Sequence, residues 1–203
     1  MPVSAPPPAP QPETAVAPPT RVAAGLGGGP RGPIGAGAGG SPSPVGAIQV
    51  REGDEYALSF PLWLDGTEYE APGVESLITR FIGDTGEPPS FGLQLWDDGD
   101  GGRGLWSSGD AMGGERFLAP VAEGEWHEVA VFFRASSEGA GFYLLFLDGQ
   151  PIDARAGVSL IGPGSSSAQI EVGLFRNGEL VSGSPGVLLG AGVLSDTLEP
   201  ILP

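Results

Sequence analysis

The fold is decided by the stretch YALSFPLWL, residues 56–64, in which every second side chain is large and apolar. Tyr56, Leu58, Phe60, Leu62 and Leu64 recur with a period of two, whereas an amphipathic helix requires about 3.6 residues per turn. Successive side chains of a strand point to opposite faces of a sheet. The stretch therefore predicts a strand with one face in the core.

The same period recurs along the chain. Residues 142–147 form an unbroken apolar run, which predicts a strand buried on both faces. The dipeptide Asp148-Gly149 predicts a turn after the apolar run, and Asn177-Gly178 is the strongest hairpin signal in the chain. Further strands are predicted by alternation at Val129, Val131 and Phe133, at Ile170, Val172 and Leu174, and by the segments 187–189 and 193–194.

Glycine and proline interrupt almost every gap between these segments, so no long helix fits. Short strands at this spacing predict an all-β fold, a two-sheet antiparallel jelly-roll sandwich. Residues 1–45 differ: they contain 12 Pro and 9 Gly and no aromatic residue. Such a segment buries too little apolar surface to fold. We expect a disordered Pro/Gly/Ala-rich tether at 1–45 and a β-jelly-roll domain at 46–203.

Composition excludes several classes of function. The 203 residues include 25 acidic and 9 basic side chains, every basic one an arginine, for a net charge of −16. This charge disfavours nucleic acid and anionic membranes as partners. No apolar run is long enough to span a membrane. The absence of cysteine excludes disulfides and thiolate zinc sites, and a single histidine excludes most multi-histidine metal sites.

A resemblance to a known family begins at Gly124-Glu125-Trp126-His127, which leads into a predicted strand. A second predicted strand follows and ends at Leu147-Asp148-Gly149. This pattern resembles the concanavalin A/laminin-G type jelly roll, and within it the heparin lyase I-like and alginate lyase-like polysaccharide lyases. The segments PPSFGLQL (88–95), QIEVGLFRN (169–177) and 187–198 carry the similarity further, over roughly residues 48–199. The resemblance implies a concave sheet that holds an acidic polysaccharide.

Lyases of this kind neutralise the uronate carboxylate with Arg, Gln or His and then use a base and an acid, often one tyrosine. The resemblance places the neutralising strand near residues 77–81, where neither Gln nor His stands. It aligns Phe175 with a family tyrosine, Glu171 with a lysine and Gln169 with another tyrosine. These departures imply that the catalytic set is largely missing.

Three residues remain as catalytic candidates. Arg80 offers a substitute neutraliser, because a guanidinium pairs with a carboxylate through two hydrogen bonds. The alternative is a surface arginine paired with Glu75 or Asp84. His127 is a candidate base, with structural hydrogen bonding at a strand entrance as the alternative. Tyr143 is a candidate acid or base, although its strand is apolar.

Four residues are candidates for carbohydrate binding: Arg80, Gln94, Trp96 and Asn177. Gln94 and Trp96 alternate with Phe91, Leu93 and Leu95, so they share the face turned away from the core. A glutamine beside an indole combines stacking with hydrogen bonding to a sugar, and an edge pair is the alternative. Trp106 and Arg103 follow a glycine-rich loop and are candidates for the same face. For Asn177, the alternative to sugar binding is a role in the Asn177-Gly178 turn.

Asp97, Asp98 and Asp100 place three carboxylates within four residues. Oxygen ligands at this spacing suit Ca²⁺, which is the one cofactor considered, and a solvated acidic turn is the alternative.

The sequence predicts a carbohydrate-recognising module with a polysaccharide or oligosaccharide as partner, secreted or at the cell surface, and monomeric. Residues 1–45 show no signal-peptide pattern, so this location follows from the resemblance. The alternatives are an active lyase, with Arg80 as neutraliser and His127 or Tyr143 as proton carrier, and a structural or surface-display module. The lyase is disfavoured by charge, because a polyuronate is repelled by an acidic domain.

Overall fold

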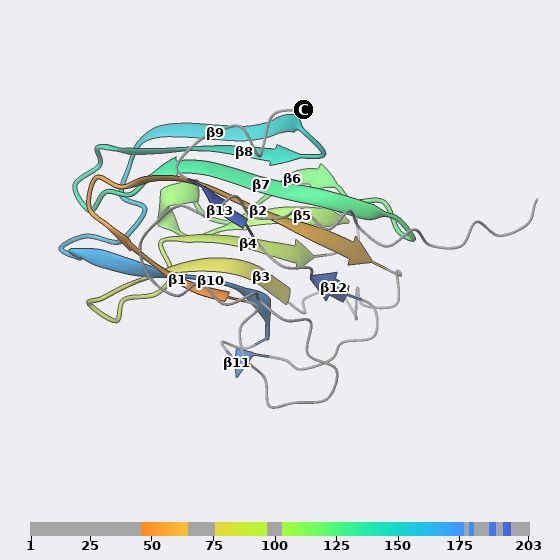
Figure 1. Ribbon diagram of the computed structural model, residues 1–203, viewed down its shortest axis with the longest axis horizontal. Coiled ribbons are helices and arrows are strands. Elements are labelled where there is room, and N and C mark those ends of the chain that lie inside the picture. The colour runs from red at the N-terminus through yellow and green to blue at the C-terminus, as the bar shows by residue number, and fades with distance from the viewer. Residues whose placement is uncertain are drawn as a thin grey trace, which may run out of the picture.

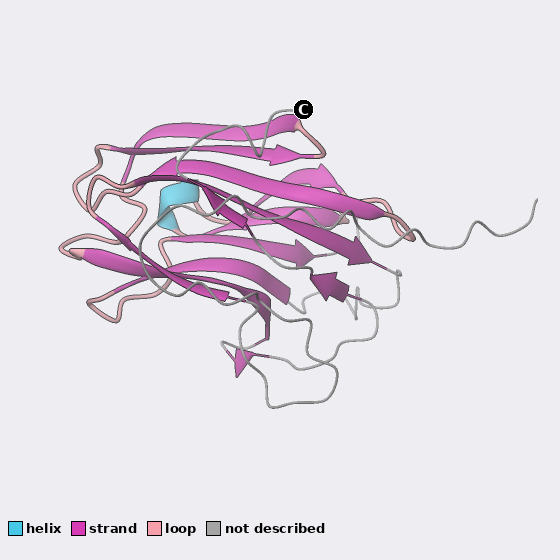
Figure 2. Ribbon diagram, viewed as in Figure 1, coloured by secondary structure: helices cyan, strands magenta, loops and turns pink. Residues whose placement is uncertain are grey.

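The structure, a computed structural model, describes residues 46–64, 76–96, 103–176, 179–180, 187–189 and 193–195. Strands are the main regular structure of these residues, and one short turn of 3-10 helix, η1 (Asp110–Met112), lies among them (Figure 2). The predicted all-β fold is confirmed. The expected tether at residues 1–45 lies outside the described residues.

The strands form two antiparallel sheets, which we call sheet A and sheet B (Figure 1). Sheet A has the spatial order β1 (Gly46–Arg51), β10 (Ser167–Arg176), β3 (Ser76–Gly83), β4 (Phe91–Trp96), β5 (Gly104–Ser108) and β6 (Arg116–Pro120), and β11 (Glu179–Leu180) also pairs with β10. Sheet B has the order β12 (Val187–Leu189), β2 (Glu55–Leu64), β7 (Trp126–Arg134), β8 (Gly141–Leu147) and β9 (Gln150–Val158), and β13 (Val193–Ser195) also pairs with β2.

The chain crosses repeatedly between the two sheets. It runs from β1 in sheet A to β2 in sheet B, and then through the consecutive strands β3 to β6 of sheet A. It returns to sheet B for β7 to β9 and inserts β10 between β1 and β3. Strands distant in sequence are therefore neighbours in sheet A, which is the arrangement of a jelly-roll sandwich.

Aromatic rings from both sheets meet in the core. Phe81 of β3 and Phe91 of β4 lie 4.7 Å apart between ring centroids. Phe81 lies 4.9 Å from Phe133 of β7, and Phe91 lies 5.3 Å from Tyr143 of β8. All four side chains are fully buried. Edge-to-face and tilted contacts at such distances stabilise a core beyond the burial of apolar area.

The strand predicted at residues 142–147 is confirmed as part of β8, but its expected burial on both faces is wrong. Tyr143, Leu145 and Leu147 are buried in the core, whereas Phe142, Leu144 and Phe146 on the other face are only half-buried. The reason is that sheet B has its partner sheet on one side, so its outer face is covered by neighbouring side chains alone.

The turn predicted at Asp148-Gly149 is confirmed. Leu147 of β8 pairs with Gln150 of β9, so Asp148 and Gly149 are the only residues between the two strands. Both have positive φ, 52° for Asp148 and 74° for Gly149, which is the backbone that a tight hairpin of this kind requires. The predicted Asn177-Gly178 turn lies outside the described residues, and the flanking Arg176 and Glu179 are paired.

Candidate functional site

Five strands of sheet A bring one residue each into a continuous cross-strand row on the face turned away from sheet B. The register pairs Phe175 with Leu77, Leu77 with Gln94, Gln94 with Trp106, and Trp106 with Phe117. Directly paired residues of antiparallel strands present their side chains on the same face. We call this row, from β10 to β6, the outer row.

The aromatic side chains of this face are in mutual contact. Trp96 lies two residues beyond Gln94 on β4, so it shares its face. The rings of Trp96 and Trp106 are 4.6 Å apart between centroids, and Trp106 and Phe117 are 5.6 Å apart. Phe117 is 39% exposed, and both tryptophans are partly exposed. These three residues form an accessible aromatic surface, which we call the outer aromatic cluster.

Gln94 lies beside this cluster with its hydrogen-bonding capacity unused. Its side chain is completely buried, and β4 is an inner strand of the sheet rather than an edge. Within the part of the chain that the structure describes, neither its Oε1 nor its Nε2 has a hydrogen-bond partner, and the same holds for Nε1 of Trp96. A buried polar group without a partner lowers stability by about 1–3 kcal/mol, so such groups call for an explanation.

Arg80 lies on the same face of sheet A, one strand away from Gln94. Its Nε donates to Oε2 of Glu171 at 2.7 Å, and its guanidinium carbon lies 4.1 Å from the centroid of the Phe175 ring. Asp84, one of the partners considered for Arg80, instead accepts hydrogen bonds from Ser166 and Ser167. The other, Glu75, lies outside the described residues.

His127 lies at the start of β7 in sheet B and is 7% exposed. Its Nδ1 is 2.7 Å from a carboxylate oxygen of Asp148, and its Nε2 is 3.0 Å from the carbonyl oxygen of Ala122. Asp148 also accepts a hydrogen bond from the backbone N–H of Glu128. His127 therefore ties the start of β7 to the β8–β9 turn, and both ring nitrogens are engaged within the protein.

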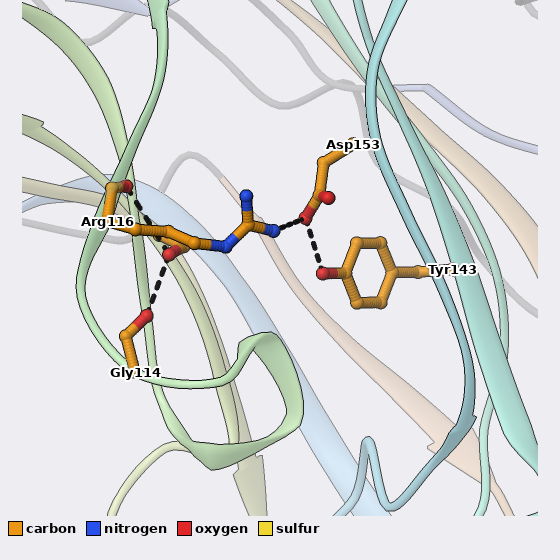
Figure 3. A network of polar contacts seen from close by, with 5 residues as sticks. Gly114, Arg116, Tyr143 and Asp153 are labelled. Atoms are coloured by element: carbon orange, nitrogen blue, oxygen red, sulfur yellow. Dashed lines mark hydrogen bonds and ion pairs between the residues drawn. The ribbon is translucent and has the colours of Figure 1, made fainter.

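Tyr143 points into the core and takes part in a polar link between the sheets (Figure 3). Its hydroxyl donates to Oδ2 of Asp153 on β9 at 2.5 Å, and the guanidinium of Arg116 on β6 donates to the same oxygen. Burial, together with this hydrogen bond, raises the pKa of Tyr143 well above its ordinary value. The phenol therefore stays protonated and serves the link between Arg116 in sheet A and Asp153 in sheet B.

The pKa of Asp153 is lowered despite its surroundings. Burial alone would raise it, but the hydrogen bonds from Arg116 and Tyr143 outweigh burial. The same hydrogen bond to Asp153 raises the pKa of Arg116. Asp153 is thus an ionised carboxylate held between a cation and a phenol, an arrangement that stabilises the charged form.

The structure brings some of the predicted site residues together and separates others. Arg80, Gln94 and Trp96 share the outer face of sheet A, whereas His127 and Tyr143 belong to sheet B, the latter facing the core. The remaining candidates lie outside the described residues: Asn177, Asp97, Asp98 and Asp100.

Two residues of this face were not predicted as site residues. Phe117 lies in a strand of five residues with no clear alternation, and Glu171 meets Arg80 from 91 positions away. Of the two residues predicted after the glycine-rich loop, Trp106 lies in the outer row and Arg103 pairs with Glu123 at 2.6 Å.

Within the described residues, no group of three or more acidic or histidine side chains is placed to hold a metal ion. The same residues contain no helix that is long and apolar enough to cross a membrane.

Comparisons with known proteins agree with this architecture. The family model described as "Polysaccharide lyase" matches residues 47–189, more than half of the chain. The solved structure of an endo-beta-1,4-glucuronan lyase from the fungus Trichoderma reesei is similar, with 18% identity, a TM-score of 0.56 and 79% of each chain covered. That of the alginate lyase Aly36B has 14% identity and a TM-score of 0.50, covering 73% of this chain and 72% of the other. At these identities the likenesses establish the fold. No curated protein sequence matches.

Replacement of Gln94 by leucine should stabilise the protein. The variant removes a buried amide without partners and keeps a side chain of similar size, so we expect the free energy of unfolding to rise by about 1–2 kcal/mol. Gln169→Leu is the matched control, because the Gln169 amide donates to Glu171 at 2.9 Å and its loss should destabilise. Urea unfolding of both variants checks this; a less stable Gln94→Leu would show that the amide is satisfied.

Replacement of Asp153 by asparagine should reduce the dependence of stability on acid. Because the pKa of Asp153 is lowered in the folded state, its carboxylate stabilises the fold above about pH 4 and loses this effect as the pH falls further. We expect Asp153→Asn to be less stable by about 2 kcal/mol near neutral pH. The difference from the unsubstituted protein should shrink toward about pH 3.

Thermal unfolding at several pH values measures this difference. Glu55→Gln is the control, because Glu55 pairs with Arg134 at the surface and both side chains are well exposed. It should change stability by less than about 1 kcal/mol at any pH. A gap between Asp153→Asn and the unsubstituted protein that stays constant from neutral to acid pH would contradict the assignment.

Proposed function

This chain belongs to the polysaccharide lyase family, and from that premise we propose that it recognises a polysaccharide or oligosaccharide on the outer face of sheet A without lyase chemistry. The outer aromatic cluster carries this proposal. Apolar faces of sugar rings stack on aromatic side chains, while sugar hydroxyls require hydrogen-bond partners. Stacking surfaces are provided by Trp96, Trp106 and Phe117. Hydrogen-bond partners are provided by the unpaired atoms of Gln94 and Trp96.

The buried amide of Gln94 has a defined part in this proposal. A bound sugar hydroxyl both donates and accepts, as the side-chain amide does, so one sugar ring supplies the partners that Gln94 lacks in the protein alone. Because Gln94 is fully buried, the hydroxyl reaches it only after the side chains that cover it move aside. Binding then stabilises the protein, because the buried amide gains the hydrogen bonds that it lacks in the unbound protein.

The separation of the candidate catalytic residues supports binding without chemistry. β-Elimination requires a neutraliser, a base and an acid around one uronate, with the proton-transfer groups within hydrogen-bond reach. Arg80 faces outward from sheet A, whereas the Tyr143 hydroxyl is held by Asp153 in the interior. Both nitrogens of His127 face acceptors of the protein itself, in sheet B.

An active lyase is the second candidate function, and membership of the family favours it. In that case Arg80 is the candidate neutraliser, because a guanidinium pairs with a uronate carboxylate through two charge-assisted hydrogen bonds. The net charge of −16 weighs against a polyanionic substrate, because long-range repulsion slows its approach.

We further propose that residues 1–45 act as a flexible tether for the domain that begins at residue 46, and that the protein acts as a monomer outside the cell or at its surface. A segment rich in proline and glycine with few charges supports the first point. The proposed location outside the cell or at its surface accords with a glycan partner.

Trp96→Ala should abolish retention by the recognised glycan. The full chain is run through native gels that contain a neutral glucan, mannan, galactan, alginate or pectin, and retarded migration reports binding. Trp63→Ala is the matched control, because Trp63 is a half-buried tryptophan on the outer face of sheet B. Binding by the unsubstituted protein and by Trp63→Ala, lost in a folded Trp96→Ala, is the expected result; equal retention of both variants would place the site elsewhere.

The same full chain should release no unsaturated uronate from acidic polymers. Ultraviolet absorbance of the unsaturated product is followed with alginate, heparin-type, chondroitin-type and pectic substrates, and we expect a flat trace. A rise in absorbance that disappears in Arg80→Ala would establish the lyase instead and would assign the neutralising role to Arg80.

A further inference from the structure

One charged pair is built into the proposed binding face. Arg80 on β3 and Glu171 on β10 are direct partners in the strand register, and Nε of Arg80 donates to Oε2 of Glu171 at 2.7 Å. The two side chains are 16% and 13% exposed, so both are largely shielded from water. Because screening by water is weak there, the carboxylate offsets much of the charge of the guanidinium.

Both members of the pair are held by further contacts. The second oxygen of Glu171 accepts a hydrogen bond from the amide of Gln169 at 2.9 Å. The guanidinium of Arg80 lies over the ring of Phe175, which belongs to the outer row, with 4.1 Å to its centroid. A cation over an aromatic face is attracted by it. The pair is therefore a fixed part of the sheet and lies beside the groups proposed to bind sugar.

We propose that Glu171 is a specificity-determining residue that makes this face select neutral sugars over uronates. The inference rests on the proposed binding of glycans at the outer face of sheet A. A sugar carboxylate that approached Arg80 would meet the Glu171 carboxylate within a few ångströms and would have to displace it from the guanidinium. Like charges at that separation repel strongly where water is excluded.

The other groups of the face suit a neutral ligand. The unpaired atoms of Gln94 and Trp96 are two nitrogen donors and one oxygen acceptor, all uncharged. The outer aromatic cluster is likewise uncharged, and the chain as a whole carries −16. A primary alcohol in place of a carboxylate meets these groups without opposing Glu171, so the site discriminates between sugars that differ at that one carbon.

The test uses matched polymers that differ only in oxidation of the primary alcohol: a neutral glucan, mannan and galactan, each paired with its carboxylated form. Affinity gels with the full chain measure Kd for each member. We expect the unsubstituted protein to bind a neutral member at least about tenfold more tightly than its carboxylated form. Glu171→Gln, which removes the charge but keeps the shape, should reduce this preference by about tenfold.

Two controls assign the effect. Glu55→Gln changes the net charge equally and disrupts the Arg134–Glu55 pair on sheet B, so it should leave the preference unchanged. The double variant Arg80→Gln/Glu171→Gln should lose the gain on carboxylated polymers, because the gain requires the released guanidinium. Thermal unfolding confirms that each variant is folded.

The outcomes separate this inference from the proposed function. If the unsubstituted protein binds a carboxylated polymer more tightly than its neutral form, the proposed role of Glu171 is wrong, but carbohydrate recognition is still supported. This measurement requires no variant. An unchanged preference in folded Glu171→Gln overturns it as well. No retention by any polymer of either form contradicts the proposed function itself, and the inference with it.

Discussion

The contact between aromatic rings of the two sheets is the constraint on which the rest of the structure depends. Phe81 and Phe91 from sheet A meet Phe133 and Tyr143 from sheet B, and these fully buried rings hold the inner faces together. Each strand places alternate side chains on opposite faces, so commitment of one face to this core leaves the other to solvent. The face of sheet A that carries the proposed site is the one that the core does not use.

The two outer faces have different chemistry, and this difference is what singles out sheet A. On sheet B, the buried side chains of Ala57 and Ala130 pack against Phe132 and Phe146, so this part of the outer face consists of small and apolar groups. On sheet A, the outer row combines aromatic rings with an amide that lacks partners. The apolar cluster of sheet B leaves no polar atom in need of a partner, whereas the buried polar atoms of Gln94 and Trp96 lack one, and the proposed sugar would supply it.

Local sequence predicted the strands well because alternation and tight-turn chemistry act over a few residues. The period of two at residues 56–64 and the Asp148-Gly149 turn both correspond to elements of the structure. Alternation also put Gln94 and Trp96 on one face. Register was beyond such reasoning: nothing within β3 indicates that Arg80 will face Glu171, and nothing near β6 indicates that Phe117 will continue a row begun on β10. Irregularities in the β10–β3, β3–β4 and β5–β6 pairings make such contacts harder still to infer from spacing.

The distance along the chain between Arg80 and Glu171 has a consequence for biosynthesis. Glu171 is the 91st residue that a ribosome adds after Arg80, and β10 cannot enter sheet A before it has been made. Strands β3 to β6 are complete much earlier, so the nascent chain holds an arginine whose built-in counter-charge has not yet been synthesised. Long-range pairing is also slow because the intervening loop must first close. The electrostatic character of this face is thus acquired only after β10 has been synthesised and has paired with β3.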